Sequence, residues 1–428
     1  MRVAACVAAL ALATSCANAQ DLDPAFGDGG FALAPRAVAP GSSSIPPGAI
    51  APAPGGGYWW AMREGTQLAL GRVTGAGAPD ATFGGGSGRI TLGDCVGNGT
   101  VDLLALPSGG VVLWTGRCLQ RRDADGALDA AFGTNVGDLE RSRLRRDPQG
   151  RYLLAGSAAN TWHVYRFDAQ GHPDASFATN GHAEPAISST NGFRGLTALA
   201  IRTDSSIVVA GWRGNTNGPS LALSGLDANG MPDPTFGVGG LVDVPHEGGD
   251  NTVRAHDAAA LADGSVLVAG ERGSGSVGCC VLVARFLRDG SLDPATGLRA
   301  FPLGNEVLPP FFEMRAAIAA TADGGAWIAR TSFPFQPLGH RTRFTLLRVT
   351  ATGELDARFA ARGWRSWYVA EPASHAPAGD YIQLHDTLFD ADGVVFFGRT
   401  FFEDDGTGNE FVTFARVRFE TPLRDGFD

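Results

Sequence analysis

Two His-Asp pairs are the residues of this 428-residue chain whose types and spacing best suit chemistry. His256-Asp257 and His385-Asp386 each begin seven residues before the aspartate of an Ala-Asp-Gly turn. A histidine beside a carboxylate can act as an acid–base pair or supply part of a metal site. The alternative is a polar lining of a water-filled channel, which we favour because no nucleophile or third ligand shares the pattern. We therefore predict no catalytic residue, no metal and no cofactor.

Aromatic residues in the longer connecting segments form a second group of candidates. Aromatic rings held on a rigid scaffold can bind sugars or peptides. Most aromatic side chains are packing residues, however, and we favour that role for these as well. The candidates are Trp212, Phe335, Trp364, Trp367, Tyr368 and Phe402.

A short recurring phrase indicates what positions these candidates. It reads LDPAFGDGG at residues 22–30 and returns with variations along the whole chain. Its aspartates are Asp23, Asp80, Asp129, Asp174, Asp233, Asp293 and Asp356, at intervals of 45 to 63 residues. The aspartate can accept hydrogen bonds from N–H groups ahead of it, the glycines accommodate positive φ, and the phenylalanine can be buried between neighbouring units. The phrase therefore predicts a repeated structural corner.

Each repeat also contains two strand patterns. One is a turn followed by an apolar run, such as ADGSVLVAG at 262–270, and the other is an alternating strand, such as VLVARFLRDG at 281–290. Four strands in each of seven units predict an all-β, seven-bladed β-propeller over residues 20–420. The last unit lacks a corner of its own. We therefore expect residues 21–35 to pair with 411–419 and close the ring.

These copies resemble the repeat L-D-x-x-F-G-x-x-G of bacterial delta-60 repeat proteins, which are exported β-propellers of unknown function. The resemblance extends over nearly all of residues 21–420, and it departs from the pattern at Thr296, Ala178 and Ala360. It implies the propeller fold and export, with irregular third and sixth units. It provides no catalytic motif that could be transferred to this chain.

Residues 1–19 have the pattern of an export signal cleaved before Gln20, with one arginine, an apolar stretch and a final Ala-Asn-Ala. Lipid attachment at Cys16 is a less favoured alternative, because Ala13 stands where such sites usually carry leucine. No other stretch approaches the roughly 20 apolar residues of a membrane helix. We expect a monomeric periplasmic or extracellular protein with an exposed tail at 421–428.

Four cysteines remain after the signal segment. An oxidising compartment allows them to pair, and three connectivities are possible. We prefer a Cys95–Cys118 disulfide, because these residues bracket one predicted hairpin. Cys279 and Cys280 could form a vicinal bridge or remain buried thiols. We favour thiols, because consecutive strand residues point to opposite faces.

The charge balance of 34 basic against 44 acidic residues gives a net charge of −10, which repels phosphate backbones and argues against a nucleic-acid partner. The loops from the second to the third strand, and from the fourth strand to the next blade, vary most and share one face; they include residues 211–220 and 363–380. We predict a non-catalytic module that binds a glycan, peptide or protein ligand there. The alternatives are a polysaccharide lyase or glycosidase acting at the channel mouth, and a structural or surface-display scaffold.

Overall fold

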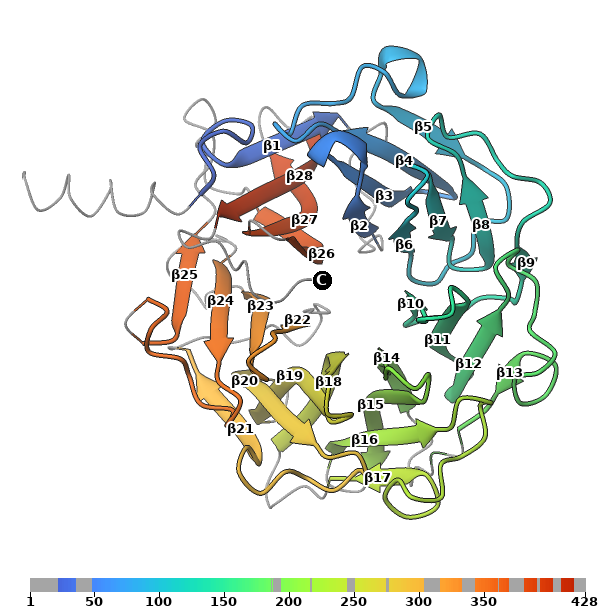
Figure 1. Cartoon of the computed structure of the whole chain (residues 1–428). Coiled ribbons are helices and arrows are strands. Elements are labelled where there is room, and N and C mark those ends of the chain that lie inside the picture. The colour runs from blue at the N-terminus through green and yellow to red at the C-terminus, as the bar shows by residue number, and fades with distance from the viewer. Residues whose placement is uncertain are drawn as a thin grey trace, which may run out of the picture.

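The computed structural model describes residues 22–35, 48–185, 187, 194–215, 218–244, 251–274, 277–303, 316–332, 343–360, 362–368, 381–390, 393–402 and 409–418. Within these residues 28 strands form seven four-stranded antiparallel sheets arranged in a ring (Figure 1). Two short 3-10 segments, η1 (Pro54–Gly56) and η2 (Gly84–Gly86), are the helical elements of the described part. In that part, no helix has the length and apolar character needed to span a membrane. The predicted seven-bladed propeller is confirmed.

In blades 1 to 6 the strands follow one another from the channel to the rim. Blade 1 contains β2 (Gly48–Pro52), β3 (Tyr58–Glu64), β4 (Gln67–Val73) and β5 (Arg89–Leu92). Blade 2 contains β6 (Asp102–Ala105), β7 (Val111–Trp114), β8 (Cys118–Arg122) and β9 (Thr134–Asn135). Blade 3 contains β10 (Arg143–Arg146), β11 (Tyr152–Ala158), β12 (Thr161–Phe167) and β13 (His182–Ala183).

The remaining blades repeat this order. Blade 4 contains β14 (Arg194–Ile201), β15 (Ile207–Asn215), β16 (Gly218–Leu226) and β17 (Leu241–Asp243). Blade 5 contains β18 (Asn251–Ala260), β19 (Val266–Ser274), β20 (Val277–Phe286) and β21 (Leu298–Pro302). Blade 6 contains β22 (Ala316–Ala320), β23 (Ala326–Ser332), β24 (Arg343–Val349) and β25 (Trp364–Tyr368). Blade 7 contains β26 (Tyr381–Asp390), β27 (Gly393–Phe402), β28 (Asn409–Arg418) and, at the rim, β1 (Phe31–Pro35).

The two ends of the described chain close the ring in blade 7 (Figure 1). β1 pairs antiparallel with β28, with Phe31 opposite Ala415, and Leu22 forms a further bridge to Val417. The outer strand of the last blade therefore comes from the beginning of the chain. Blades 1 and 7 cannot separate without breaking this ladder, and the predicted closure is confirmed.

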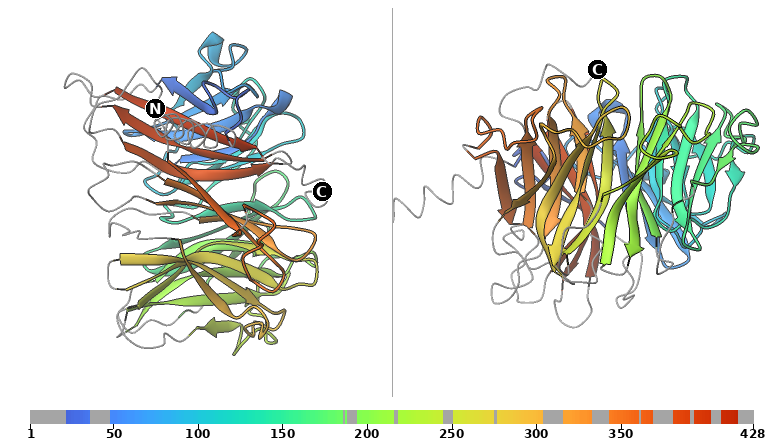
Figure 2. Two further views of the ribbon diagram at one scale, coloured as in Figure 1. Left: turned by 90° about the vertical axis from the view of Figure 1, so that its left-hand side faces the viewer. Right: turned by 90° about the horizontal axis from the view of Figure 1, so that it is seen from below.

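Strands run between two faces of the ring in every blade, as the side views of Figure 2 show. The antiparallel order places the first-to-second turns, the third-to-fourth turns and the corners on one face, which we call the corner face. The second-to-third turns and the connections between blades lie on the other, which we call the variable-loop face. Regular turns and variable connections are therefore segregated to opposite faces.

The recurring phrase forms the same corner in every blade. All seven aspartates accept a hydrogen bond from the backbone N–H two residues ahead, at 2.9–3.1 Å. In blade 3, Phe177 is fully buried against Gly230 of blade 4, which has a φ of +81°. A Cβ atom at Gly230 would lie 2.6 Å from the Phe177 ring, so both the close packing and the φ angle require glycine. The predicted turn and its buried phenylalanine are confirmed.

An arginine that the sequence analysis did not single out completes the corner. In blade 3, Arg166 Nε donates to Asp174 at 2.8 Å, and the guanidinium lies 4.6 Å from the centroid of the Phe177 ring. Arg166 Nη1 also donates to the carbonyl of Ala228 in blade 4. One side chain therefore connects an aspartate, an aromatic ring and the next blade. The arginines at this place are Arg72, Arg121, Arg166, Arg285, Arg348 and Arg416.

Blade 4 contacts the next blade through an arginine at a different position. Its third strand has Gly225 in place of the arginine, and Arg202, which follows the inner strand, lies 5.6 Å from the centroid of the Phe236 ring. Arg202 Nη2 donates to the carbonyl of Arg288 in blade 5 at 3.1 Å. A guanidinium therefore reaches the next blade here also, but from another strand.

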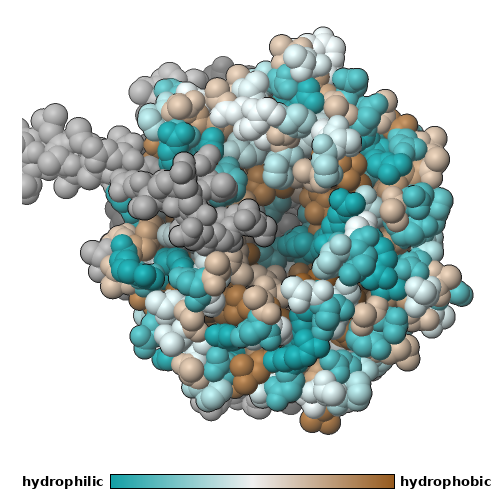
Figure 3. Space-filling model, in the orientation of Figure 1, coloured by the Kyte–Doolittle hydropathy of each residue, from teal (hydrophilic) through white to brown (hydrophobic). Residues whose placement is uncertain are grey.

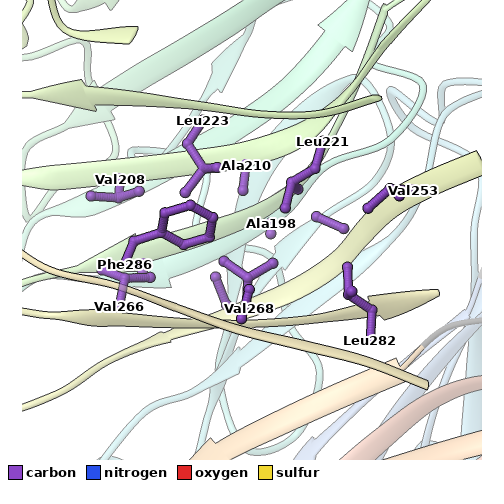
Figure 4. Packing of buried hydrophobic residues seen from close by; sticks show 14 of the residues in the cluster. Ala198, Val208, Ala210, Leu221, Leu223, Val253, Val266, Val268, Leu282 and Phe286 are labelled. Atoms are coloured by element: carbon purple, nitrogen blue, oxygen red, sulfur yellow. The ribbon is translucent and has the colours of Figure 1, made fainter. Parts of the chain in front are cut away.

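Hydrophobic side chains fill the space between adjacent blades. In Figure 4, Val208 and Leu223 of blade 4 pack with Val266 and Phe286 of blade 5. Val209, the next residue along β15, belongs instead to the core between blades 3 and 4. Successive residues of one strand thus face two different cores, which explains why the second strands are apolar at nearly every position.

Three of the four remaining cysteines bear on the disulfide predictions. Cys95, in the connection between β5 and β6, and Cys118 of β8 form a disulfide with their Cα atoms 5.9 Å apart. Cys280 is also disulfide-bonded, so the expectation of a free thiol there was wrong. A register shift between β19 and β20 next to Cys280 interrupts the side-chain alternation on which that expectation relied. The side chain of Cys279, residues 1–19 and residues 421–428 lie outside the described part.

Candidate functional site

The inner strands surround a channel, and the described part of its wall encloses a cavity of about 250 Å³. Figure 3 shows the ring hollowed at its centre. The charged residues that line this cavity are Asp102, Arg143, Arg145, Asp257 and Asp386. Three carboxylates and two guanidinium groups therefore meet in one small space.

The three carboxylates each connect two inner strands. Asp102 of β6 accepts the backbone N–H of Leu144 in β10 at 2.8 Å. In the same way, Asp257 accepts an N–H of β22 at 3.2 Å, and Asp386 accepts an N–H of β2 at 3.1 Å. The acceptor always belongs to one blade and the donor to the next. One oxygen of each carboxylate therefore satisfies a backbone donor between neighbouring blades.

Arg145 bridges two of these carboxylates across the channel. Its Nη1 lies 3.6 Å from Asp102 and its Nη2 lies 3.4 Å from Asp257. Arg145 lies deep in the molecule, yet 35% of its side chain stays exposed because it faces the channel. Burial by itself would lower the pKa of Arg145, but the charges of Asp257, Asp102 and Asp386 outweigh it and raise this pKa. Arg143 adds a second guanidinium 3.9 Å from Asp257.

The predicted His-Asp pairs lie on the inner strands β18 and β26, but the two members of a pair do not act together. The ladder with the second strand shifts register at both histidines, so each histidine is a bulged residue. His256 Nδ1 accepts the backbone N–H of Ala316 at 3.2 Å, whereas Asp257 lines the cavity. His385 is buried. The histidines therefore serve the packing of the blades, and the aspartates face the channel.

Glu271 of β19 is a largely but not fully buried acid beside His256. His256 Nε2 lies 3.8 Å from Glu271, and Arg254 Nη1 lies 3.5 Å from it. Burial would raise the pKa of Glu271, but the hydrogen bond and charge of His256, with the charges of Arg254 and Arg330, lower it to about 2. Glu271 therefore carries a fixed negative charge near the variable-loop face.

Trp212 of β15 lies between two arginines toward the variable-loop face. The guanidinium carbons of Arg141 and Arg254 are 5.9 Å and 5.6 Å from the centroid of its ring. Gly195 of β14 is opposite Trp212, and a Cβ atom there would lie 2.5 Å from the indole Nε1. Glycine thus allows the ring to lie across the inner strand. Trp212, Arg141 and Arg254 are all partly exposed, and we call them the Trp212 cluster.

The other described aromatic candidates do not join this cluster. Trp367 is 5% exposed and packs in the core between blades 6 and 7, which is the packing role favoured from the sequence. Trp364 begins β25 directly after the corner, so it lies toward the corner face. The side chains of Tyr368 and Phe402, and the whole of Phe335, lie outside the described residues.

Two segments expected as variable loops are partly strands. Residues 364–368 of the expected loop 363–380 form β25, the outer strand of blade 6. Residues 211–220 form the ends of β15 and β16, which pair up to Asn215 and Gly218. Their variable length and composition suggested loops. Pairing within the sheet includes residues 211–215, 218–220 and 364–368, because neighbouring strands supply backbone partners.

Asp102, Arg143 and Arg145 were missed in the sequence because none is next to a histidine. Asp102 stands seven residues before the turn glycine Gly109, as Asp257 and Asp386 do before theirs, and Arg143 has the same offset from its turn. A search for charged residues seven positions before each turn glycine would therefore have found Asp102 and Arg143. No comparable signal indicated Arg145.

A family model described as a domain of unknown function (DUF5122) beta-propeller matches residues 203–236 and 261–295. Each match begins at the first turn of a blade and ends at its corner, in blades 4 and 5. The chain is a β-propeller repeat protein. The predicted resemblance to delta-60 repeat proteins is thereby confirmed.

No curated protein matches this chain in sequence. Solved structures with a similar fold include polysaccharide lyase Uly1, at 9% identity and a TM-score of 0.43 over 90% of this chain and 91% of that chain. Another is the calcium-binding protein regucalcin from Agrobacterium tumefaciens, at 17% identity and a TM-score of 0.37 over 72% of this chain and 88% of that chain. A third is a gluconolactonase from Xanthomonas campestris, at 12% identity and a TM-score of 0.33 over 69% of this chain and 94% of that chain. These likenesses concern the fold and carry no argument about function.

Proposed function

We propose that this propeller is a non-catalytic binding module that takes a glycan, peptide or protein ligand on its variable-loop face, with the Trp212 cluster at the centre of the contact. The observation that carries the proposal is the partly exposed indole with two guanidinium groups within 6 Å of its centroid. An indole offers a flat apolar face to a sugar ring or an aromatic side chain. Arginine can donate paired hydrogen bonds to a carboxylate of the same ligand.

The origin of the cluster supports a binding role. Arg141 precedes β10 of blade 3, Trp212 belongs to blade 4 and Arg254 belongs to blade 5. Three consecutive blades therefore build one surface, which exists only when these blades pack against one another. Such a surface is held rigidly by the sheets beneath it, which limits the entropy lost when a ligand binds.

The test is a glycan array and a pull-down with the mature protein, each repeated with Trp212→Ala. We expect the variant to lose roughly tenfold or more in affinity, the effect of removing about 1.4 kcal/mol of contact. Trp364→Ala is the matched control, because Trp364 also has an arginine 4.1 Å from its ring but lies toward the corner face. Equal binding by the wild type and Trp212→Ala would overturn the proposal.

An enzyme remains a second candidate because one cavity holds Asp102, Asp257 and Asp386. Paired carboxylates can hydrolyse glycosides when one of them keeps a proton. Arg145 contacts two of the three and supplies positive charge to both, which disfavours such a division of roles. Assays against a panel of polysaccharides decide between the functions. Turnover that disappears in Asp257→Asn, with Trp212→Ala still active, would favour the enzyme.

We further propose that the protein is an exported monomer. The pattern of residues 1–19 and the Cys95–Cys118 disulfide, which suits an oxidising compartment, support export. Cell fractionation and the mass of the purified chain test it, with Gln20 as the expected first residue. A modified Cys16 at the new N-terminus would favour lipid anchoring instead. A protein that binds nothing and turns over nothing would fit the scaffold alternative.

A further inference from the structure

Three potential metal ligands converge on the outer strands of blade 3, away from the channel. His163 Nδ1 lies 3.0 Å from His182 Nε2 and 3.6 Å from Glu184 Oε1, and His182 Nε2 lies 3.8 Å from the same oxygen. A point equidistant from these three atoms is about 2 Å from each, which is the length of zinc–nitrogen and zinc–oxygen bonds. The three atoms are therefore spaced to hold one ion.

The pairing of β12 and β13 brings the three residues together. Val164 is opposite Ala183 and Tyr165 is opposite His182. Continuing this register places His163 opposite Glu184. Val164 and Ala183 pack into the core between blades 3 and 4, so the alternation of side chains directs the three ligands to the other face of the sheet. The sequence pattern did not indicate this site, because His163 and His182 are 19 residues apart.

The two imidazole rings are held in place by stacking. Tyr165 stacks on His182 with ring centroids 4.3 Å apart and an angle of 7° between the planes. The rings of His163 and His182 are nearly parallel as well, at 20°. His163 Nδ1 and His182 Nε2 share a hydrogen bond of 3.0 Å, so a bound ion replaces that hydrogen bond while the stacked rings keep their places.

We propose that His163, His182 and Glu184 bind a divalent transition-metal ion, with zinc the best match, and leave a fourth coordination position open. Two imidazole nitrogens and one carboxylate oxygen suit zinc, whereas calcium and magnesium prefer sites made of oxygen atoms. The open position can hold water or a donor atom from a bound ligand. This site is separate from the Trp212 cluster and does not depend on the proposed binding function.

The test is calorimetric titration of the tag-free mature protein with zinc chloride after chelator treatment and dialysis. We expect one ion per chain, with affinity that weakens as the pH falls because protons compete for the imidazoles. In His182→Ala the affinity should fall by at least the roughly 10- to 100-fold that changes outside the ligand shell can produce. His172→Ala is the matched control, since this exposed histidine of the same blade lies outside the cluster.

A second variant separates the loss of a metal ligand from the loss of folding. Glu184→Gln alters an exposed side chain, so it should fold normally and still bind zinc more weakly than the wild type. Cobalt substitution provides an independent signal, because visible absorption bands report tetrahedral coordination. The proposal is overturned if the wild type binds no zinc, or if both variants bind it as tightly as the wild type does.

Discussion

The corners and the channel wall are both built from seven equivalent positions, yet they differ in how strictly the blades repeat. Every corner has its aspartate and the same hydrogen bond, and six third strands provide the same arginine. On the channel wall, the position seven residues before the turn glycine is aspartate in three blades, Arg143 in blade 3 and Ala317 in blade 6. Every pair of blades must be joined, so the corners vary little, and blade 4 keeps a guanidinium at its corner by using Arg202. The channel wall does not have to join the blades identically, so specific sites can form on the wall and on the variable-loop face.

The largest effect should come from removing a corner aromatic ring. Phe177→Ala leaves a cavity between blades 3 and 4 where the ring packs against Gly230. We expect the free energy of unfolding to fall by about 3–5 kcal/mol, measured by chemical denaturation. Val238→Ala, at an exposed position, should change it by less than roughly 0.5 kcal/mol. Equal effects of the two changes would show that the corner does not hold the blades together.

A smaller loss is expected when the corner ion pair is broken. In Arg166→Met, Asp174 loses its hydrogen-bonded arginine and keeps Arg151 at 3.9 Å. The Arg166 and Asp174 side chains are 2% and 16% exposed. Because the pair is nearly buried, we expect a loss of about 2–3 kcal/mol in the free energy of unfolding. Arg117→Ala breaks the pair with Asp138, which is much more exposed, and should cost less stability than Arg166→Met does. A reversed order in denaturation experiments would contradict the assigned role of the corner arginine.

A pH-dependent effect should come from Glu271, which lies outside the repeated corners. The pKa of Glu271 is about 2 in the folded protein against 4.5 for an ordinary glutamate, so its charged form stabilises the fold. This contribution is fully present above the unfolded-state pKa and is lost as the pH falls toward 2. Glu271→Gln should therefore be less stable than the wild type by about 1–3 kcal/mol at pH 7, and the difference should shrink below pH 4.5. Denaturation curves from pH 7 to pH 2.5 measure it, and parallel pH profiles would disprove it.

The smallest effect on stability is expected at the Trp212 cluster. Trp212 is partly exposed, so Trp212→Ala should lower the free energy of unfolding by about 1 kcal/mol, measured by thermal denaturation. The same change should remove ligand binding, which would separate function from stability. A loss as large as that of Phe177→Ala would mean that Trp212 belongs to the scaffold.

Much of the scaffold could be predicted because its causes are local. The aspartate, phenylalanine and glycine of the phrase interact within a few residues, so their spacing predicted the turn, the buried ring and the number of blades. The corner arginine stands eight residues before the aspartate, as Arg166 does before Asp174, and was equally available in the sequence. Parts of the segments at 211–220 and 363–380 were mistaken for loops, because variable length and composition do not reveal whether a neighbouring strand is present.

The sequence by itself determined the repeating unit, its corner and the exchange of an N-terminal strand into the last blade, since short-range hydrogen bonding and side-chain alternation specify each of them. Only the tertiary structure decided which charges meet. Arg145 contacts both Asp102 and Asp257, although Arg145 and Asp257 are 112 residues apart in the sequence. His163 contacts His182 across the pair of strands β12 and β13. These contacts depend on how seven sheets close around one axis and on the register of each ladder. Residue types alone do not encode such distances, because the same types at the same spacing serve packing elsewhere in the ring.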